Sequence, residues 1–115
     1  MDVGCYHGEF FRWLGDKIGP SVGLDPLYEH AKGLDGRHRF LKAAFEPKMQ
    51  FPDQSFDVVS LLATIEHMQD TDAVAGEARR LLRAGGKAII TVPSVAVDRI
   101  LDVLIRFRII DGMSV

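Results

Sequence analysis

The stretch DVGCYHGEF, residues 2–10, joins the end of a short strand to the start of a helix through a turn that contains two glycines. Gly4 and Gly8 permit positive φ angles and let the backbone pass close to a ligand. The helix expected after the turn begins with free backbone N–H groups that point at the same place. Such a turn often binds a nucleotide, although a tight strand–helix loop without a ligand can have the same glycines.

Strand-like and helix-like segments alternate along the chain on both sides of this pattern. The evidence is the helical spacing of apolar residues and the short apolar runs bounded by turn residues. The expected strands are 2–3, 21–24, 39–44, 56–62 and 87–92; the expected helices are 9–18, 72–84 and 97–110, with helical turns within 27–33 and a loop over 48–55. This alternation predicts a single α/β domain, residues 1–115, in which helices cover both faces of a doubly wound parallel sheet.

The residues that follow each strand are the place to look for a ligand site. In open parallel sheets, ligands bind beyond the carboxyl ends of the strands. The second expected strand ends at Asp25, and an acid at this distance from a glycine turn can accept hydrogen bonds from both hydroxyls of a ribose. Asp25 therefore favours a nucleotide site over a tight loop with a capping aspartate.

Composition excludes several classes of protein. The chain has 115 residues, of which 47% are hydrophobic and 26% charged, and its net charge of -2 argues against a nucleic-acid partner. Its apolar stretches are too short to span a membrane. The single cysteine, Cys5, and the lack of a signal-peptide pattern predict a cytoplasmic protein. His30 and His38 have no ligand at metal-binding spacing, so no metal site is expected.

Four segments, in this order and at this spacing, resemble the class I S-adenosylmethionine-dependent methyltransferases. DVGCYHGEF is similar to the first family motif, D-V-G-C-G-x-G, and VGLDP is similar to the second strand with its ribose-binding acid. FPDQSFDVVSLLATIEHMQD resembles the family's loop and fourth strand, which a Glu-His pair follows. EARRLLRAGGKAIITVPS resembles the next helix and the fifth strand. The resemblance implies a Rossmann-like sheet with strand order 3-2-1-4-5.

The resemblance also implies a role for each matching position. Asp2 and Gly4 would face the methionine end of S-adenosylmethionine, and Cys5 would contribute its backbone. Asp25 would hold the ribose. The remaining cofactor-binding positions would be Tyr6 and Gly8 in the turn, Leu24 and Pro26 beside the sugar or adenine, Ala44 and Phe45 at the adenine, and Ala63 and Thr64 beside the methionine portion and the transferred methyl.

The sequence departs from the family pattern at two of these positions. Tyr6 stands where the family has a glycine, so its ring must either point away from the cofactor or fill part of the site. Ala44 stands where many relatives have an acid that bonds the adenine amino group; backbone groups near Phe45 could hold the adenine instead.

Both ends of the sequence are short against the family pattern. Only Met1 precedes Asp2, and the C-terminal β-hairpin of the family is missing before the end at Val115. The sequence could therefore be a fragment of a longer chain. If it is the whole protein, the fifth strand would be an open edge, and the last helix, 97–110, would lack part of its cover. Exposed apolar surface of this kind predicts a homodimer through the sheet edge or the last helix.

Several polar and aromatic side chains have two readings. His67 follows Glu66 just after the fourth strand and is a candidate general base, but the pair could instead shape the loop or bond the backbone. His7 could bond a cofactor carboxylate or face solvent. We expect Phe10 and Leu14 to be core residues. Charged residues of the helix 72–84 are expected to face water: Glu77, Arg79, Arg80 and Arg83.

The predicted function is methyl transfer from S-adenosylmethionine to a small-molecule acceptor, with no covalent step on the protein. Two alternatives stay open. An NAD-binding Rossmann domain shares the glycine turn and the acid but needs G-x-G-x-x-G, whose second glycine is missing here. A non-catalytic methyltransferase-like fold, used as a binding or dimerisation module, would be consistent with Tyr6 and Ala44.

Overall fold

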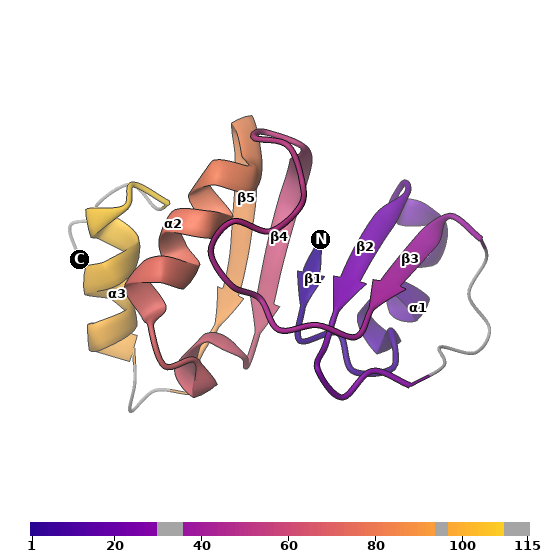
Figure 1. Cartoon of the computed structure of the whole chain (residues 1–115), viewed down its shortest axis with the longest axis horizontal. Coiled ribbons are helices and arrows are strands. Elements are labelled where there is room, and N and C mark those ends of the chain that lie inside the picture. The colour runs from indigo at the N-terminus through magenta and orange to yellow at the C-terminus, as the bar shows by residue number, and fades with distance from the viewer. Residues whose placement is uncertain (30–35, 94–96, 110–115) are drawn as a thin grey trace. The chain divides into compact units, whose positions relative to one another are not determined.

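The computed structural model describes residues 1–29, 36–93 and 97–109 (Figure 1). Contacts along the chain group it into two compact units, Met1–Phe45 and Glu46–Val115. Each unit is an α/β structure of its own, and the two are taken in turn. The prediction of one domain over 1–115 concerns both units together and stays a prediction.

The first unit contains three parallel strands, β1 (Asp2–Val3), β2 (Ser21–Leu24) and β3 (His38–Leu41), in the order β3-β2-β1 (Figure 1). In the register of the ladder, Val3 pairs with Leu24, and Leu24 pairs with Leu41. The three strands therefore end at the same level, which brings the residues that follow them together. β3 is shorter than the predicted 39–44, because the chain turns directly after Leu41.

The helix of the first unit, α1 (Glu9–Leu14), is shorter than the predicted 9–18. Gly15 at its end has a φ of 56°, and a 3-10 turn, η1 (Gly15–Lys17), follows. Phe11 is the buried residue of α1, whereas Phe10 and Leu14 are only half-buried, so the prediction that both belong to the core is wrong. The ring of Phe11 lies against the rings of His38 and Phe40 of β3. Of the helical turns predicted within 27–33, the structure has one hydrogen-bonded turn at Pro26–Leu27, which the N–H of Tyr28 closes on the carbonyl oxygen of Asp25 at 3.2 Å, and no helix over 27–29; 30–33 lie outside the described residues.

The second unit contains two parallel strands, β4 (Phe56–Leu62) and β5 (Leu82–Thr91), which a 3-10 turn, η2 (Ile65–His67), and the helix α2 (Thr71–Leu81) connect (Figure 1). The helix α3 (Val97–Arg106) packs mainly on α2. The orders β3-β2-β1 and β4-β5 are the two portions of the predicted order 3-2-1-4-5, and the predicted fold class is confirmed. No helix within the described ranges is long and apolar enough to cross a membrane.

The boundary between α2 and β5 differs from the prediction. The helix ends at Leu81 rather than at the Gly85-Gly86 pair, and β5 begins at Leu82. Gly86 lies inside the strand where β4 comes close: a β-carbon there would lie 3.0 Å from the carbonyl oxygen of Asp57. β4 and β5 are also less buried than expected for strands covered on both faces, since Val58 is 38% exposed and Ile89 43% exposed.

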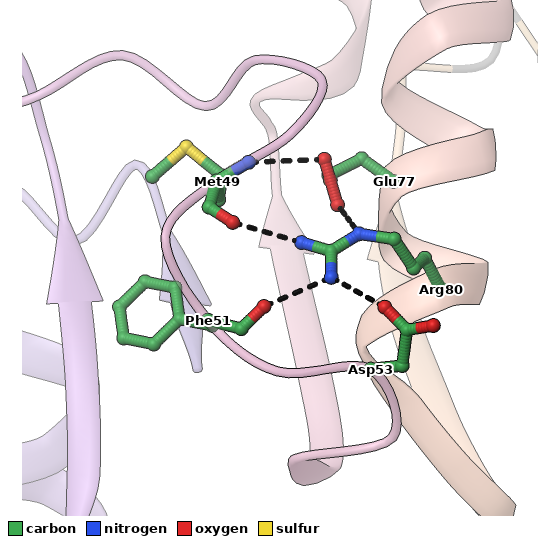
Figure 2. Close-up of polar contacts among 5 residues, drawn as sticks. All are labelled: Met49, Phe51, Asp53, Glu77 and Arg80. Carbon is green, nitrogen blue, oxygen red and sulfur yellow. Dashed lines mark hydrogen bonds and ion pairs between the residues drawn. The ribbon is translucent and has the colours of Figure 1, made fainter.

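The helix α2 holds the preceding loop through Arg80 (Figure 2). The guanidinium of Arg80 donates to the carbonyl oxygens of Phe51 at 2.8 Å and Met49 at 3.0 Å, and to the carboxylates of Asp53 and Glu77. Glu77 is 4% exposed, and its second oxygen accepts the backbone N–H of Met49 at 3.2 Å. The prediction that Glu77 and Arg80 face water is therefore wrong.

Contacts between α2 and α3 complete the second unit. Arg106 of α3 donates to the carboxylate of Asp72 at 3.0 Å, and the ring of Phe107 lies over Gly76. Ile100, Val103 and Leu104 are buried. Leu101 and Ile105 remain 37% and 44% exposed, which leaves part of α3 uncovered in the described chain.

Candidate cofactor site

The glycine turn after β1 is fastened to the end of β2. The backbone N–H groups of Gly4 and Cys5 both donate to the carbonyl oxygen of Leu24, at 2.8 and 3.0 Å. Gly4 has a φ of 78° and Gly8 a φ of 81°, so both use the left-handed conformation that glycine adopts without strain. The turn therefore depends on its glycines for its shape, as the sequence predicts.

Asp25 follows β2 and makes hydrogen bonds to residues in the turn after β1 and at the end of β3. Its carboxylate accepts the backbone N–H of Tyr6 on Oδ2 at 2.9 Å and the backbone N–H of Leu27 on Oδ1 at 2.7 Å. Its own N–H donates to the carbonyl oxygen of Leu41 at 3.1 Å. The residue is 8% exposed. Because an ionised carboxylate has about four acceptor positions, each oxygen of Asp25 can still accept one further hydrogen bond.

Tyr6 occupies the position of the missing glycine by adopting the glycine conformation. Its φ is 50°, which costs an L-residue about 1 kcal/mol. The residue is 52% exposed, and its ring lies against the ring of His7 with 3.8 Å between ring centres. Tyrosine thus fits the glycine position at the cost of backbone strain, and its ring is directed outward rather than into the core of the unit.

Cys5 lies beneath the turn and is 3% exposed. A β-carbon on Gly23 of β2 would lie 2.9 Å from its sulfur, so the thiol fills the space beside that glycine. Burial, together with the nearby carboxylates of Asp2 and Asp25, raises the pKa of the Cys5 thiol to about 12. The thiol is therefore protonated at neutral pH and is a poor nucleophile, which agrees with a purely backbone role.

Two backbone N–H groups of the turn that precedes α1 already have hydrogen-bond partners. The backbone N–H of His7 donates to the carboxylate of Glu9 at 3.1 Å, and the N–H of Gly8 donates to the carbonyl oxygen of Cys5 at 2.8 Å. The helix has only six residues. These two amides precede the helix, so the expected free N–H groups at the start of α1 itself, from Glu9 onward, stay a prediction.

The other expected positions of the first unit lie at the same ends of the strands. Asp2, Leu24 and Phe45 are buried, at 3%, 1% and 8% exposure. Pro26 and Ala44 are exposed. The ladder register aligns the ends of the three strands, and the ten expected positions of this unit lie at or follow these ends along the chain: Asp2, Gly4, Cys5, Tyr6, Gly8, Leu24, Asp25, Pro26, Ala44 and Phe45. Their contacts with a cofactor stay a prediction.

The sequence profile of the methyltransferase domain family matches residues 1–90. The chain belongs to this family. It is 32% identical over 96 residues to a sterol 24-C-methyltransferase of Gibberella zeae, a match that covers 75% of the chain and 25% of that protein. It is also 32% identical over 108 residues to a sarcosine/dimethylglycine N-methyltransferase of Halorhodospira halochloris, covering 85% of the chain and 38% of that protein.

Solved structures agree with this assignment. An S-adenosylmethionine-dependent methyltransferase from Thermotoga maritima is 30% identical to the chain, with a TM-score of 0.61 over 77% of the chain and 41% of that structure. A further S-adenosylmethionine-dependent methyltransferase, from Mesorhizobium loti, shares the fold with a TM-score of 0.69 over 79% of the chain and 44% of that structure. This methyltransferase domain thus spans about a quarter to two fifths of the length of these relatives.

The end of β4 carries the expected site residues of the second unit. Ala63 has a φ of 50°, and its N–H donates to Thr91 at the end of β5, at 2.8 Å to the hydroxyl oxygen and 3.1 Å to the carbonyl. The hydroxyl of Thr64 donates to the carbonyl oxygen of Leu62 at 2.8 Å. A non-glycine residue with positive φ therefore stands after β4 as well as after β1, and such strain is often found at functional positions.

The Glu-His pair of the methyltransferase domain lies in η2. The side chain of His67 is 79% exposed, and its Nε2 lies 3.8 Å from Oε1 of Glu66. The side chain of Glu66 is only 13% exposed, and its Oε2 has no hydrogen-bond partner within the part of the chain that the structure describes. Sequence reasoning singled out His67, but Glu66 is the more constrained of the two.

Proposed function

We propose that the protein is an S-adenosylmethionine-dependent methyltransferase whose cofactor binds at the carboxyl ends of β1, β2 and β3. The observation that carries this proposal is the Asp25 carboxylate, which is fixed by the N–H groups of Tyr6 and Leu27 and retains acceptor capacity on both oxygens. A ribose offers two adjacent hydroxyl donors, and two fixed acceptor oxygens match them. Membership of the family supports the choice of this cofactor.

Nine of the ten expected site residues of the first unit, all but Tyr6, have the following parts in this proposal. Gly4 leaves the end of β1 open to the methionine portion, with Asp2 beside it, and Asp25 holds the ribose. Pro26 and Leu24 border the sugar, and Ala44 and Phe45 border the adenine. The backbone of Cys5 and Gly8 shapes the turn.

The family resemblance extends the proposal to the second unit. Ala63 and Thr64 would contact the methionine portion, and His67 stays a candidate general base. When bound, the cofactor supplies an electrophilic methyl group on a positively charged sulfur. The contribution of the protein is to hold the reactants in line and to exclude water, which is the main source of rate acceleration in a transfer of this kind.

The acceptor of the proposed reaction is a small molecule. The names of the related enzymes support this class, since they include a sterol and an amino-acid methyltransferase. A cytoplasmic location and a homodimer belong to the same proposal. Leu101 and Ile105, exposed on α3, support self-association, and sedimentation of a monomer at all concentrations would contradict it.

Calorimetric titration of S-adenosylhomocysteine into the chain tests the cofactor site, with NAD as the competing ligand. We expect micromolar binding of S-adenosylhomocysteine and none of NAD. Asp25→Ala should abolish binding, because it removes both ribose acceptors. Asp16→Ala is the matched control: Asp16 lies in the same unit, is exposed, and pairs with Arg37 at 3.7 Å.

Equal binding by wild type and Asp25→Ala would contradict the assignment of the ribose. A folded wild-type chain that binds neither ligand would support the non-catalytic alternative instead.

A further inference from the structure

Tyr6 is a strained residue at the centre of the proposed cofactor site. Its φ of 50° places a bulky side chain in a conformation that favours glycine, and its N–H is held by the carboxylate of Asp25 at 2.9 Å. Backbone strain of this kind persists only where the surrounding contacts enforce it, and it is concentrated at functional sites. A glycine would form the same turn without strain, so the side chain itself is the feature to explain.

The ring of Tyr6 is held by its neighbour rather than by the core. It is 52% exposed and lies against His7, with 3.8 Å between ring centres and 49° between ring planes. His7 is fixed in turn by α1, because its N–H donates to Glu9 at 3.1 Å and its carbonyl oxygen accepts from Arg12 at 3.4 Å. One side of the Tyr6 ring is thus supported, while about half of the residue remains open to a ligand.

The position of Tyr6 in the turn corresponds to one part of the cofactor. In the proposed arrangement Gly4 faces the methionine portion and Asp25 holds the ribose. Tyr6 follows Gly4 by two residues, and its backbone N–H donates to Asp25, so the residue connects these two positions along the turn. In S-adenosylmethionine the atom that joins the methionine portion to the ribose is the positively charged sulfonium sulfur. An aromatic face attracts a cation placed over it.

We propose that Tyr6 is a specificity-determining residue whose ring contacts the sulfonium and favours the charged methyl donor over its neutral product. This inference rests on the proposed function and deepens it. S-adenosylhomocysteine has a thioether in place of the sulfonium, so the ring adds little to its binding. Tyr6 therefore strengthens binding of the donor without slowing release of the product.

The test compares the dissociation constants of S-adenosylmethionine and S-adenosylhomocysteine in wild type, Tyr6→Phe and Tyr6→Gly. Tyr6→Gly removes the ring and suits a φ of 50°, so it should fold. We expect its affinity for S-adenosylmethionine to fall by a factor between about 3 and about 30, the range of a cation–π contact from exposed to desolvated. Its affinity for S-adenosylhomocysteine should stay within about twofold, and Tyr6→Phe, which keeps the ring, should preserve the preference for the donor.

Trp13→Leu is the matched control, because Trp13 is an aromatic residue of the same unit that is 80% exposed and lies outside the turn. The carboxylate of Asp25 attracts the sulfonium in every variant, so a change in the ratio of the two constants isolates the ring. If Tyr6→Gly weakens both ligands equally, or neither, the inference is overturned while the proposed function stands. If wild type binds neither ligand, the proposed function itself fails.

Discussion

Replacing Arg80 by methionine should lower the free energy of unfolding by about 3 kcal/mol. Methionine retains most of the aliphatic stem and removes the guanidinium, whose hydrogen bonds hold the carbonyl oxygens of Met49 and Phe51 and the carboxylate of Glu77 (Figure 2). Glu77 would then be a charged group with a side chain only 2% exposed, and among the described residues its one remaining donor would be the N–H of Met49.

The magnitude follows from the burial of the two partners. Removing one member of a buried ion pair costs about 3–5 kcal/mol, because the other charge is left without compensation. Arg80 is 29% exposed and water can partly replace it, so the lower end of that range applies. The contact with Asp53, which is 75% exposed, adds little.

Urea denaturation of the chain measures this change, with Arg79→Met as the control. Arg79 is the exposed neighbour of Arg80 on α2, and its replacement should change stability by less than about 0.5 kcal/mol. The double variant Glu77→Gln/Arg80→Met should lose less than the sum of the two single variants, because the buried charge is gone. Equal losses in Arg79→Met and Arg80→Met would refute the reasoning.

Further predictions concern packing, ionisation and capping. Gly23→Ala should lower the free energy of unfolding by about 1–3 kcal/mol, because its β-carbon would lie 2.9 Å from both the Cys5 sulfur and a ring carbon of Phe40. Gly19→Ala is the control: its β-carbon would meet no described atom within 4 Å, so stability in the same denaturation assay should not change. Burial raises the pKa of Cys5 to about 12, against 9.0 for a free thiol, so between these values only the unfolded state ionises. The free energy of unfolding should therefore fall as pH rises from 9.0 toward 12. A flat pH profile, or rapid reaction of the native thiol with a thiol reagent at pH 8, would contradict this prediction. Asp70→Ala should cost about 1 kcal/mol, since Asp70 accepts the N–H of Ala73 at 2.9 Å as the cap of α2, and an unchanged thermal midpoint would exclude that role.

The strand-end residues were predictable because the parallel topology determines where they lie. A glycine turn after one strand and an acid after the next reach the same edge of a sheet whatever the details between them. Gly4, Gly8 and Asp25 therefore lie where the sequence places them. The backbone hydrogen bond from Tyr6 to Asp25 could not be read from the sequence, because it depends on a positive φ at a tyrosine.

Glu77 was assigned to water because charged residues usually face solvent, yet its spacing carried the opposite signal. It stands three residues after Val74 and four before Leu81, and all three are buried on α2. Helical periodicity thus placed Glu77 on the buried face. What the sequence lacked was the partner, since Arg80 pairs with Glu77 and also reaches Met49 and Phe51 in a loop distant along the chain.

The end of α2 was misplaced for a different reason. A glycine pair after a helical stretch is the usual C-terminal signal, and Gly85-Gly86 directly follows the predicted helix 72–84. In the structure these glycines belong to β5, where Gly86 allows close approach of β4. Pairing with β4 thus places these glycines in a strand, although the local sequence favours a helix C-terminus. The sequence alone does not distinguish a glycine that ends a helix from one that allows two strands to approach closely.

The most direct test of the cofactor site is the response of individual backbone amides in an isotope-labelled chain to added S-adenosylhomocysteine. The amides of Tyr6 and Leu27 donate to the two oxygens of Asp25. Their NMR chemical shifts should therefore both change strongly when a ribose binds that carboxylate. The chemical shift of the Gln54 amide, which donates to the carbonyl of Arg80 in the second unit, should stay unchanged. If the protein is saturated with S-adenosylhomocysteine and the amide chemical shifts of Tyr6 and Leu27 do not change, the account is contradicted.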